Sequence, residues 1–211
     1  MSLEVRSVQF AFGSGSPLFD DYSAVYSEGE MVALTGHSGR GKSTLLYILG
    51  LMLKPTGGSI RLDGRDTSTM PDAARARLRA ALFGFVFQDA ALDSTRSVLD
   101  NVLESSLYRR TSRAAERPYA LSLMNRLGVA ARADAKPGQL SGGQAQRIAL
   151  CRALVSRPRF VLADEPTGNL DASTGDVVVE ALRHQAQSGS LVIIATHDPR
   201  VVAKCDRVVS L

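Results

Sequence analysis

Short runs of apolar residues recur along the chain and predict buried β-strands. Residues 31–34, 160–163 and 191–195 contain no polar position, which is typical of strands that are covered on both faces. Each of these runs is followed, directly or after a short loop, by a helical pattern. Because strands that alternate with helices form parallel sheets with helices on both faces, the chain is predicted to have an α/β core.

The remaining patterns predict an N-terminal antiparallel β portion and an inserted helical subdomain. Residues 5–12 and 22–26 alternate as strands do, and residues 59–62 run into Asp63-Gly64, a pair that suits a type I′ hairpin turn. Strand patterns vanish between about residues 89 and 139, where helices take over. We therefore expect one domain over residues 1–211, with a core of residues 1–88 and 140–211 and a helical subdomain at about 89–139.

Two boundaries inside that helical section can be predicted from capping residues. Ser97 begins a helix as its N-cap, and a second helix stops before Gly128, a plausible C′ residue. Pro118 is expected either to kink that second helix or to mark its start, because proline lacks a backbone N–H.

A glycine-rich loop between the first buried strand and the next helix predicts a phosphate site. Residues 36–44 fit the pattern G-x-x-x-x-G-K-[ST], in which backbone N–H groups and a helix N-terminus surround phosphate groups. Lys42 would add a positive charge at the β- and γ-phosphates, and the Ser43 hydroxyl would bind Mg²⁺. The nucleotide-binding candidates in this loop are Gly36, Ser38, Gly39, Gly41, Lys42, Ser43 and Thr44.

Two further features carry chemistry. Asp164 ends a buried strand, at the sheet edge where ligands of parallel sheets lie, and could hold Mg²⁺. Glu165 follows it and could orient or deprotonate a water molecule. Ser141, with Gly142 and Gly143, opens another helix and would form a second anion site at a helix N-terminus.

Composition narrows the class of protein. At 211 residues, with 45% hydrophobic residues and a net charge of +4, the chain suits a globular domain with a basic surface. The arginines are scattered, so no nucleic-acid partner is expected. Cys151 and Cys205 lack a redox spacing and are expected to be free thiols. No signal peptide or membrane-length apolar run is visible, so a cytosolic chain is expected.

In their order along the chain, these motifs resemble the nucleotide-binding domain of ATP-binding cassette (ABC) transporters. The likeness extends over the whole chain: phosphate loop, Q-loop glutamine Gln88, signature Leu140–Gln144, Walker B 160–165, D-loop 169–171 and switch His197. The segments around residues 85–88 and 163–171 are similar to the bacterial branch of macrolide-export, lipoprotein-release and cell-division (FtsE-like) ATPases.

The resemblance implies a role for each matched residue. Phe12 would stack on adenine, Gln88 would bind Mg²⁺ with Ser43, Glu165 would polarise the attacking water, and His197 would contact the γ-phosphate. Two copies would pack head to tail, so that each ATP lies between one copy's phosphate loop and its partner's signature. The residues implied in these contacts are Phe12, Lys42, Ser43, Gln88, Ser141, Gly143, Gln144, Asp164, Glu165, Asp171 and His197.

The expected function is therefore an ATPase subunit that forms an ATP-linked homodimer and drives an integral membrane permease, from the inner face of a bacterial membrane. Two alternatives stay open: a regulatory ATP-binding module with low hydrolysis, and an ABC ATPase that acts on nucleic acid. The chain departs from the family at Arg40, bulky between two glycines, and at residues 93–96, which replace a more apolar stretch.

Overall fold

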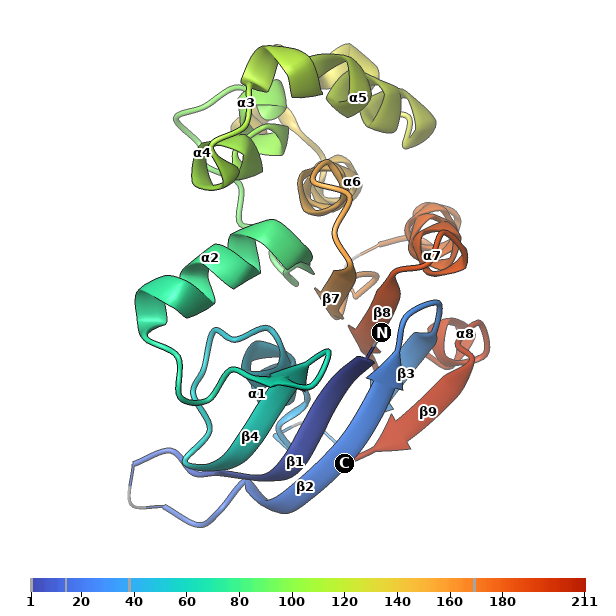
Figure 1. Cartoon of the computed structure of the whole chain (residues 1–211). Helices are drawn as coiled ribbons and strands as arrows, with labels where there is room; N and C mark the ends of the chain where they lie inside the picture. The colour runs from blue at the N-terminus through green and yellow to red at the C-terminus, as the bar shows by residue number, and fades with distance from the viewer. Residues whose placement is uncertain (1, 14, 38, 169) are drawn as a thin grey trace.

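Two β-sheets and a helical layer make up the computed structural model, which describes residues 2–13, 15–37, 39–168 and 170–211 (Figure 1). The larger sheet is parallel, and its five strands run in the order β6-β7-β8-β3-β9. The strands are β3 (Met31–Thr35), β6 (Phe83–Val86), β7 (Phe160–Asp164), β8 (Leu191–Ala195) and β9 (Arg207–Ser210).

The smaller sheet is antiparallel and comes from the N-terminal part of the chain. Its strand order is β2-β1-β4-β5. Asp63 and Gly64 join the last two strands with φ values of 49° and 79°, which a type I′ turn requires. The strands are β1 (Ser2–Phe10), β2 (Phe19–Ser27), β4 (Gly57–Leu62) and β5 (Arg65–Asp66).

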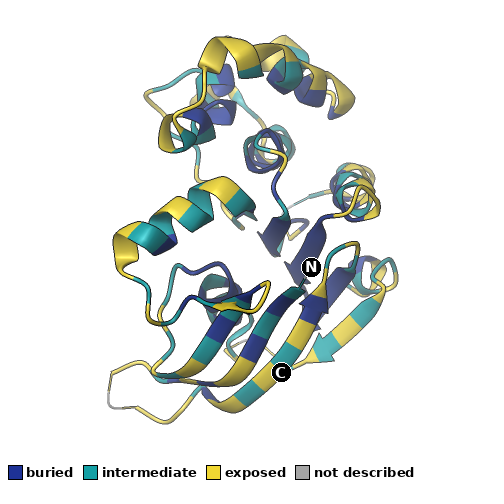
Figure 2. Cartoon of the chain, in the orientation of Figure 1, coloured by how far each residue is buried: buried dark blue, intermediate teal, exposed yellow. Residues whose placement is uncertain are grey.

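The strands of the parallel sheet are buried because side chains on its two faces enter two different hydrophobic cores. In β7, Phe160 and Leu162 pack with the antiparallel sheet and the first helix, whereas Val161 and Ala163 pack with the helical layer. Figure 2 shows β7 and β8 buried throughout, whereas buried residues in β1 and β2 are interspersed with partly buried and exposed ones. The unbroken apolar runs of the sequence therefore reflect burial on both faces.

Helices cover both faces of the parallel sheet. Helix α1 lies in the core under the antiparallel sheet, while α3, α5, α6 and α7 contribute to the second core. The helices are α1 (Lys42–Leu49), α2 (Asp72–Leu82), α3 (Val98–Val102), α4 (Ser105–Arg109), α5 (Arg113–Arg126), α6 (Gly142–Leu154), α7 (Ala172–Gln187) and α8 (Pro199–Val202), with 3₁₀ turns at Ala130–Arg132 and Pro137–Gln139.

This architecture confirms the predicted α/β fold class with its antiparallel portion and helical subdomain. Of the two roles predicted for Pro118, that of helix start is contradicted by the structure. Helix α5 does not begin at Pro118 but at Arg113, after the N-cap Ser112, whose hydroxyl accepts a hydrogen bond from the Ala115 backbone N–H. The cap satisfies one free N–H group of the first turn, and the helix continues through the proline.

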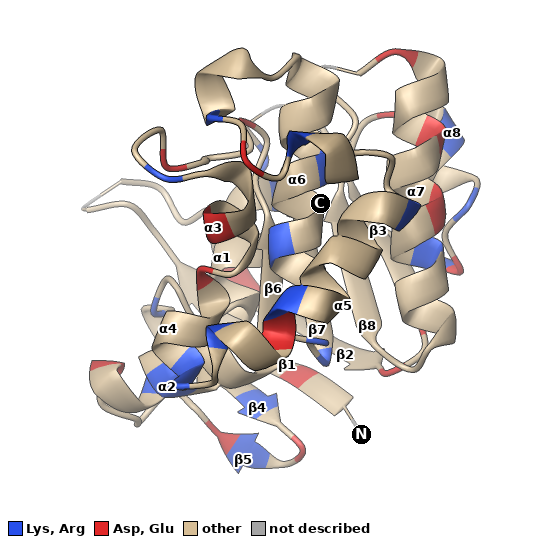
Figure 3. Ribbon diagram, turned by 90° about the horizontal axis from the view of Figure 1, so that it is seen from above, with Lys and Arg blue, Asp and Glu red and all other residues tan. Residues whose placement is uncertain are grey.

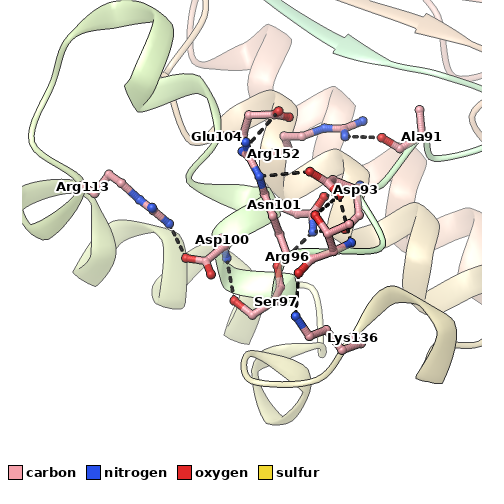
Figure 4. Close-up of polar contacts among 11 residues, drawn as sticks. Ala91, Asp93, Arg96, Ser97, Asp100, Asn101, Glu104, Arg113, Lys136 and Arg152 are labelled. Atoms are coloured by element: carbon pink, nitrogen blue, oxygen red, sulfur yellow. Dashed lines mark hydrogen bonds and ion pairs between the residues drawn. The ribbon is translucent and has the colours of Figure 1, made fainter.

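A buried asparagine fixes the loop that leads into α3 (Figure 4). The Asn101 side chain has no exposed surface. Its oxygen accepts from the Asp93 backbone N–H at 2.7 Å, and its Nδ2 donates to the carbonyls of Asp93 and Ser97 at 3.0 and 2.9 Å. Every polar atom of this amide is therefore paired, as burial requires.

We expect Asn101→Leu to lower the free energy of unfolding by about 2–4 kcal/mol, because it leaves buried backbone groups without partners. Urea denaturation measures this, with Asn125→Leu on the exposed side of α5 as the control, expected to change stability by about 0.5 kcal/mol or less. Equal losses in the two variants would contradict the assignment.

The charged residues are mixed over the surface. Both Lys or Arg and Asp or Glu residues are spread over the helices and loops (Figure 3). The structure contains exposed ion pairs such as Arg200 with Asp198 at 2.7 Å and Lys204 with Asp176 at 2.9 Å. Among the described residues, no helix combines the length and apolar character needed to cross a membrane.

Candidate functional site

A cleft of about 870 Å³ lies where the parallel strands end. Gly36 follows β3, Gln88 follows β6, Asp164 ends β7 and His197 follows β8. Since the carboxyl ends of parallel strands meet at one edge of a sheet, residues far apart in sequence come together there. The cleft is lined by Phe12, Leu18, Gly36, His37, Gly39, Gly41, Lys42, Ser43, Thr44, Gln88, Asp164, Glu165, Gly168 and His197.

The phosphate loop has the backbone geometry that its glycines allow. Gly39 and Gly41 have φ values of 82° and 92°, a region that other residues rarely adopt. A Cβ at Gly41 would also lie 2.8 Å from the Leu18 side chain. Helix α1 begins immediately afterwards at Lys42, so its free N–H groups face the loop. The predicted residue Ser38 lies outside the described residues.

Lys42 places its ammonium group inside this loop. Its Nζ donates to the backbone carbonyls of Gly36 at 2.8 Å and His37 at 3.3 Å. The loop therefore combines a side-chain cation with a helix N-terminus, and both favour a bound anion.

Oxygen ligands gather beside the loop. The Ser43 hydroxyl donates to Asp164 Oδ1 at 2.9 Å, and the Tyr47 hydroxyl lies 3.4 Å from Asp164 Oδ2. Burial raises the pKa of Asp164 above its usual value, and the two hydroxyl contacts oppose that shift. Tyr47 is not among the residues predicted from the sequence, although it stands four residues after Ser43 and so lies on the same face of α1.

Glu165 and His197 form a pair at the mouth of the cleft. His197 Nδ1 lies 2.8 Å from Glu165 Oε1. The Glu165 backbone is left-handed, with φ = 43°, and its N–H donates to the Ala195 carbonyl at 2.9 Å. The histidine side chain is 76% exposed and the carboxylate side chain 15%. The pair can hold a water molecule and a phosphate group near one another.

Phe12 and Gln88 lie at other parts of the cleft wall. The Phe12 side chain is 64% exposed and meets Phe10 edge to face, with 4.9 Å between ring centroids. One face of the Phe12 ring is therefore available for a planar ligand. Gln88 reaches the cleft from the segment after β6.

The signature residues do not line this cleft within one chain. Ser141 caps α6: its hydroxyl accepts from the Gln144 N–H at 3.2 Å, and Gln144 Oε1 accepts from the Ser141 N–H at 3.0 Å. Neither of them, nor Gly143, is among the described residues that form the cleft wall. The structure therefore separates two glycine-rich helix ends that the resemblance assigns to one ATP.

Asp171 is likewise outside the cleft wall and caps α7. Hydrogen bonds from Ser173 and from the backbone and hydroxyl of Thr174 hold the pKa of its carboxyl well below the usual range. Asn169, two residues earlier in the D-loop, lies outside the described residues. In the single chain, the described part of the D-loop is thus engaged in helix capping.

The donor set suits a nucleotide with a hard cation. Ser43, Gln88 and Asp164 offer oxygen atoms in one cleft, and oxygen is the ligand that Mg²⁺ prefers. Among the described residues, no group of three or more His, Cys, Asp or Glu side chains could hold a metal ion. A cation here would therefore need phosphate oxygens as further ligands, which is common for Mg²⁺.

Several known proteins have sequences similar to that of this chain. The family model described as ABC transporter matches residues 19–168. LolD of Bordetella avium, a lipoprotein-releasing system ATP-binding protein, is 48% identical over 191 residues, which cover 90% of this chain and 83% of LolD. MacB 1/2 of Paracoccus denitrificans, a macrolide export ATP-binding/permease protein, is 43% identical over 99% of this chain, but the match covers 32% of MacB.

Solved structures agree with the sequence comparison. The dimeric structure of MJ0796, a bacterial ABC transporter cassette, has a TM-score of 0.91 and 33% identity, covering 99% of this chain and 94% of that one. A dimeric post-hydrolysis structure of MJ0796 bound to ADP and Pi has a TM-score of 0.89 and 31% identity, with the same coverage. The predicted family is confirmed: the chain belongs to the ABC transporter family and is an ATP-binding cassette with ATPase function.

Proposed function

We propose that two copies of this chain pack head to tail around two ATP molecules and drive a separate membrane permease. The observation that carries this proposal is the separation of Ser141 from the Lys42 cleft within one chain. A second copy would bring its own α6 N-terminus to the open side of the cleft and complete the phosphate site. The dimeric structures of MJ0796 support this arrangement.

In the proposed ATP hydrolysis, each residue of the cleft has a separate role. Lys42 and the N–H groups of the loop stabilise negative charge on the phosphates, and Ser141 and Gly143 of the second copy close the site. Glu165 accepts a hydrogen bond from the attacking water, and His197 holds the γ-phosphate in line. Catalysis then rests on positioning and electrostatics, as in other phosphoryl transfers.

Ser43, Gln88 and Asp164 are the residues that would hold Mg²⁺ beside the nucleotide. When bound, that ion supplies positive charge to the phosphate oxygens. The hydrogen bond between Ser43 and Asp164 keeps the two oxygen ligands next to each other before the nucleotide arrives.

A groove of about 620 Å³ next to the Gln88 segment is the proposed contact for the permease. Phe87 and Ala91, on either side of Gln88, line it together with the aromatic residues Phe83 and Phe85. Tyr108 at its rim is 69% exposed. An apolar segment of a membrane protein would bury this surface and lie against the loop that carries Gln88, on the inner face of the membrane.

The proposal is tested by measuring ATP hydrolysis by the purified chain, alone and with its permease in lipid vesicles. We expect hydrolysis in both cases and faster hydrolysis with the permease. A chain that binds ATP but hydrolyses almost none, with or without the permease, would favour the regulatory module. The proteins named LolD and MacB point to lipoprotein release or macrolide export as the processes to examine first.

Phe12→Ala should weaken ATP binding about tenfold or more, because loss of base stacking costs about 1–3 kcal/mol per base. Equilibrium binding of a fluorescent ATP analogue measures the effect. Phe12→Tyr is the matched control and should bind as the wild type does, since it keeps the aromatic face. Unchanged affinity in Phe12→Ala would remove Phe12 from the nucleotide site.

A further inference from the structure

The segment that carries Gln88 is attached to helix α6. Gln146 is only 5% exposed, and its Nε2 donates to the Phe87 carbonyl at 3.1 Å. Phe87 is the residue directly before Gln88. A small cavity of about 120 Å³ is lined by both glutamines together with Glu165. Gln88 and Glu165 also line the proposed catalytic cleft, so this part-buried hydrogen bond lies beside that cleft.

A second side chain of α6 fixes the far end of the same segment. Arg152 donates to the carbonyl of Ala91 through Nη1 at 2.6 Å and to that of Ala90 through Nη2 at 2.7 Å. Ala90 and Ala91 have φ values of 60° and 45°, a left-handed conformation that alanine adopts only under constraint. Figure 4 shows Arg152 reaching Ala91, with Asn101 holding Asp93 just beyond.

From these contacts we propose that Gln146 is a positioning residue for Gln88. The hydrogen bond from Gln146 sets the place of the Phe87 carbonyl, and with it the direction in which the Gln88 side chain leaves the backbone. The inference rests on the proposed function, in which Gln88 binds Mg²⁺ beside ATP.

The same contacts join two parts of the ATPase. Helix α6 follows the N-cap Ser141, which in the proposed dimer contacts the ATP bound by the other copy. Side chains of the same helix contact the segment that places Gln88 in the cleft of the copy to which α6 belongs. The same helix therefore carries the proposed signature end and contacts the segment that carries Gln88.

The test compares Gln146→Leu with Gln185→Leu, a partly buried control glutamine on α7 that donates to Ser190 Oγ at 2.7 Å and does not line the cleft. Two quantities are measured: the Mg²⁺ concentration for half-maximal ATPase activity, and the gain in affinity for a slowly hydrolysed ATP analogue when Mg²⁺ replaces EDTA. For Gln146→Leu we expect about tenfold more Mg²⁺ to be needed and a smaller affinity gain, as for residues that orient a metal ligand. The control should match the wild type.

A double substitution separates positioning from general destabilisation. If Gln146 acts through Gln88, the pair Gln88→Ala with Gln146→Leu should show the same Mg²⁺ dependence as Gln88→Ala alone, because interacting residues are non-additive. Additive effects, or an unchanged Mg²⁺ dependence in Gln146→Leu, would overturn the inference. Should the leucine variant fail to fold, Gln146→Glu keeps the size, removes the donor and is measured in the same way.

The failure of the proposed function is recognised separately. If Gln88→Ala itself leaves both Mg²⁺ measurements unchanged, Gln88 is not a ligand and the proposed metal site is wrong. If Gln88→Ala shifts them and Gln146→Leu does not, the metal site stands and only the role of Gln146 is refuted.

Discussion

Glu165→Gln is expected to lower the ATPase rate by about two to four powers of ten, the range for a lost acid–base group. The substitution keeps the size of the side chain and removes its negative charge, so the attacking water is no longer polarised. ATP binding should persist, because the loop and Lys42 are untouched. Since bound ATP is then not consumed, the ATP-linked dimer should accumulate and be visible by size-exclusion chromatography.

The matched control is Glu180→Gln, an exposed glutamate on α7 outside the described cleft wall. It should retain the wild-type rate and should not trap a dimer. A Glu165→Gln variant that hydrolyses ATP at a near-normal rate would show that another group acts on the water. In that case His197, 2.8 Å from the carboxylate, is the next residue to replace.

Much of the core could be predicted because its signals are local. The strands β3, β7 and β8 are continuous apolar runs, and each run ends within a residue of its predicted boundary. Such runs arise where alternate side chains enter different cores, as Phe160 and Val161 do. The Asp63-Gly64 turn was predictable for a similar reason, since its φ values depend on two adjacent residues.

Apart from Phe12, which follows β1 of the antiparallel sheet, the predicted residues that meet in the cleft share one property: each lies at or just after the end of a parallel strand or belongs to the phosphate loop. Lys42, Asp164, Glu165 and His197 are all among the lining residues. The roles assigned to them remain predictions. Ser141 is different, because its proposed contact lies across a dimer. Neither Ser141 nor Asp171 is among the described residues that line the cleft.

Contacts between side chains and distant backbone groups could not be predicted. Nothing in the sequence distinguishes Arg152 from other helical arginines, yet it donates to the carbonyls of Ala91 and Ala90, which lie 61 and 62 residues earlier in the chain. The left-handed Ala90 and Ala91 carry no sequence signal either, because alanine does not favour that conformation. Asn101 lies in α3, yet its buried side chain holds the loop before that helix through Asp93, and no local pattern indicates this contact.

Mixing two inactive variants should restore ATPase activity if each site needs both copies. Lys42→Ala disables a chain's phosphate loop, and Ser141→Arg places a bulky cation at its signature end. Homodimers of either variant contain only damaged sites. A mixed dimer, however, contains one intact site, formed by the loop of the Ser141→Arg chain and the signature of the Lys42→Ala chain. With random pairing and independent sites, an equimolar mixture should recover up to about a quarter of the wild-type rate.

The rate is measured across mixing ratios at constant total protein, and it should peak near equal amounts because mixed dimers are then most abundant. The control mixture combines Lys42→Ala with a chain that carries both substitutions. Its mixed dimers have no intact site, so it should remain inactive at every ratio. An ATPase confined to one chain gives a different result: the first mixture would never exceed the sum of its parts, and the wild-type rate per chain would not depend on concentration. Recovery in the first mixture alone therefore requires that Ser141 of one copy act on the ATP held by Lys42 of the other.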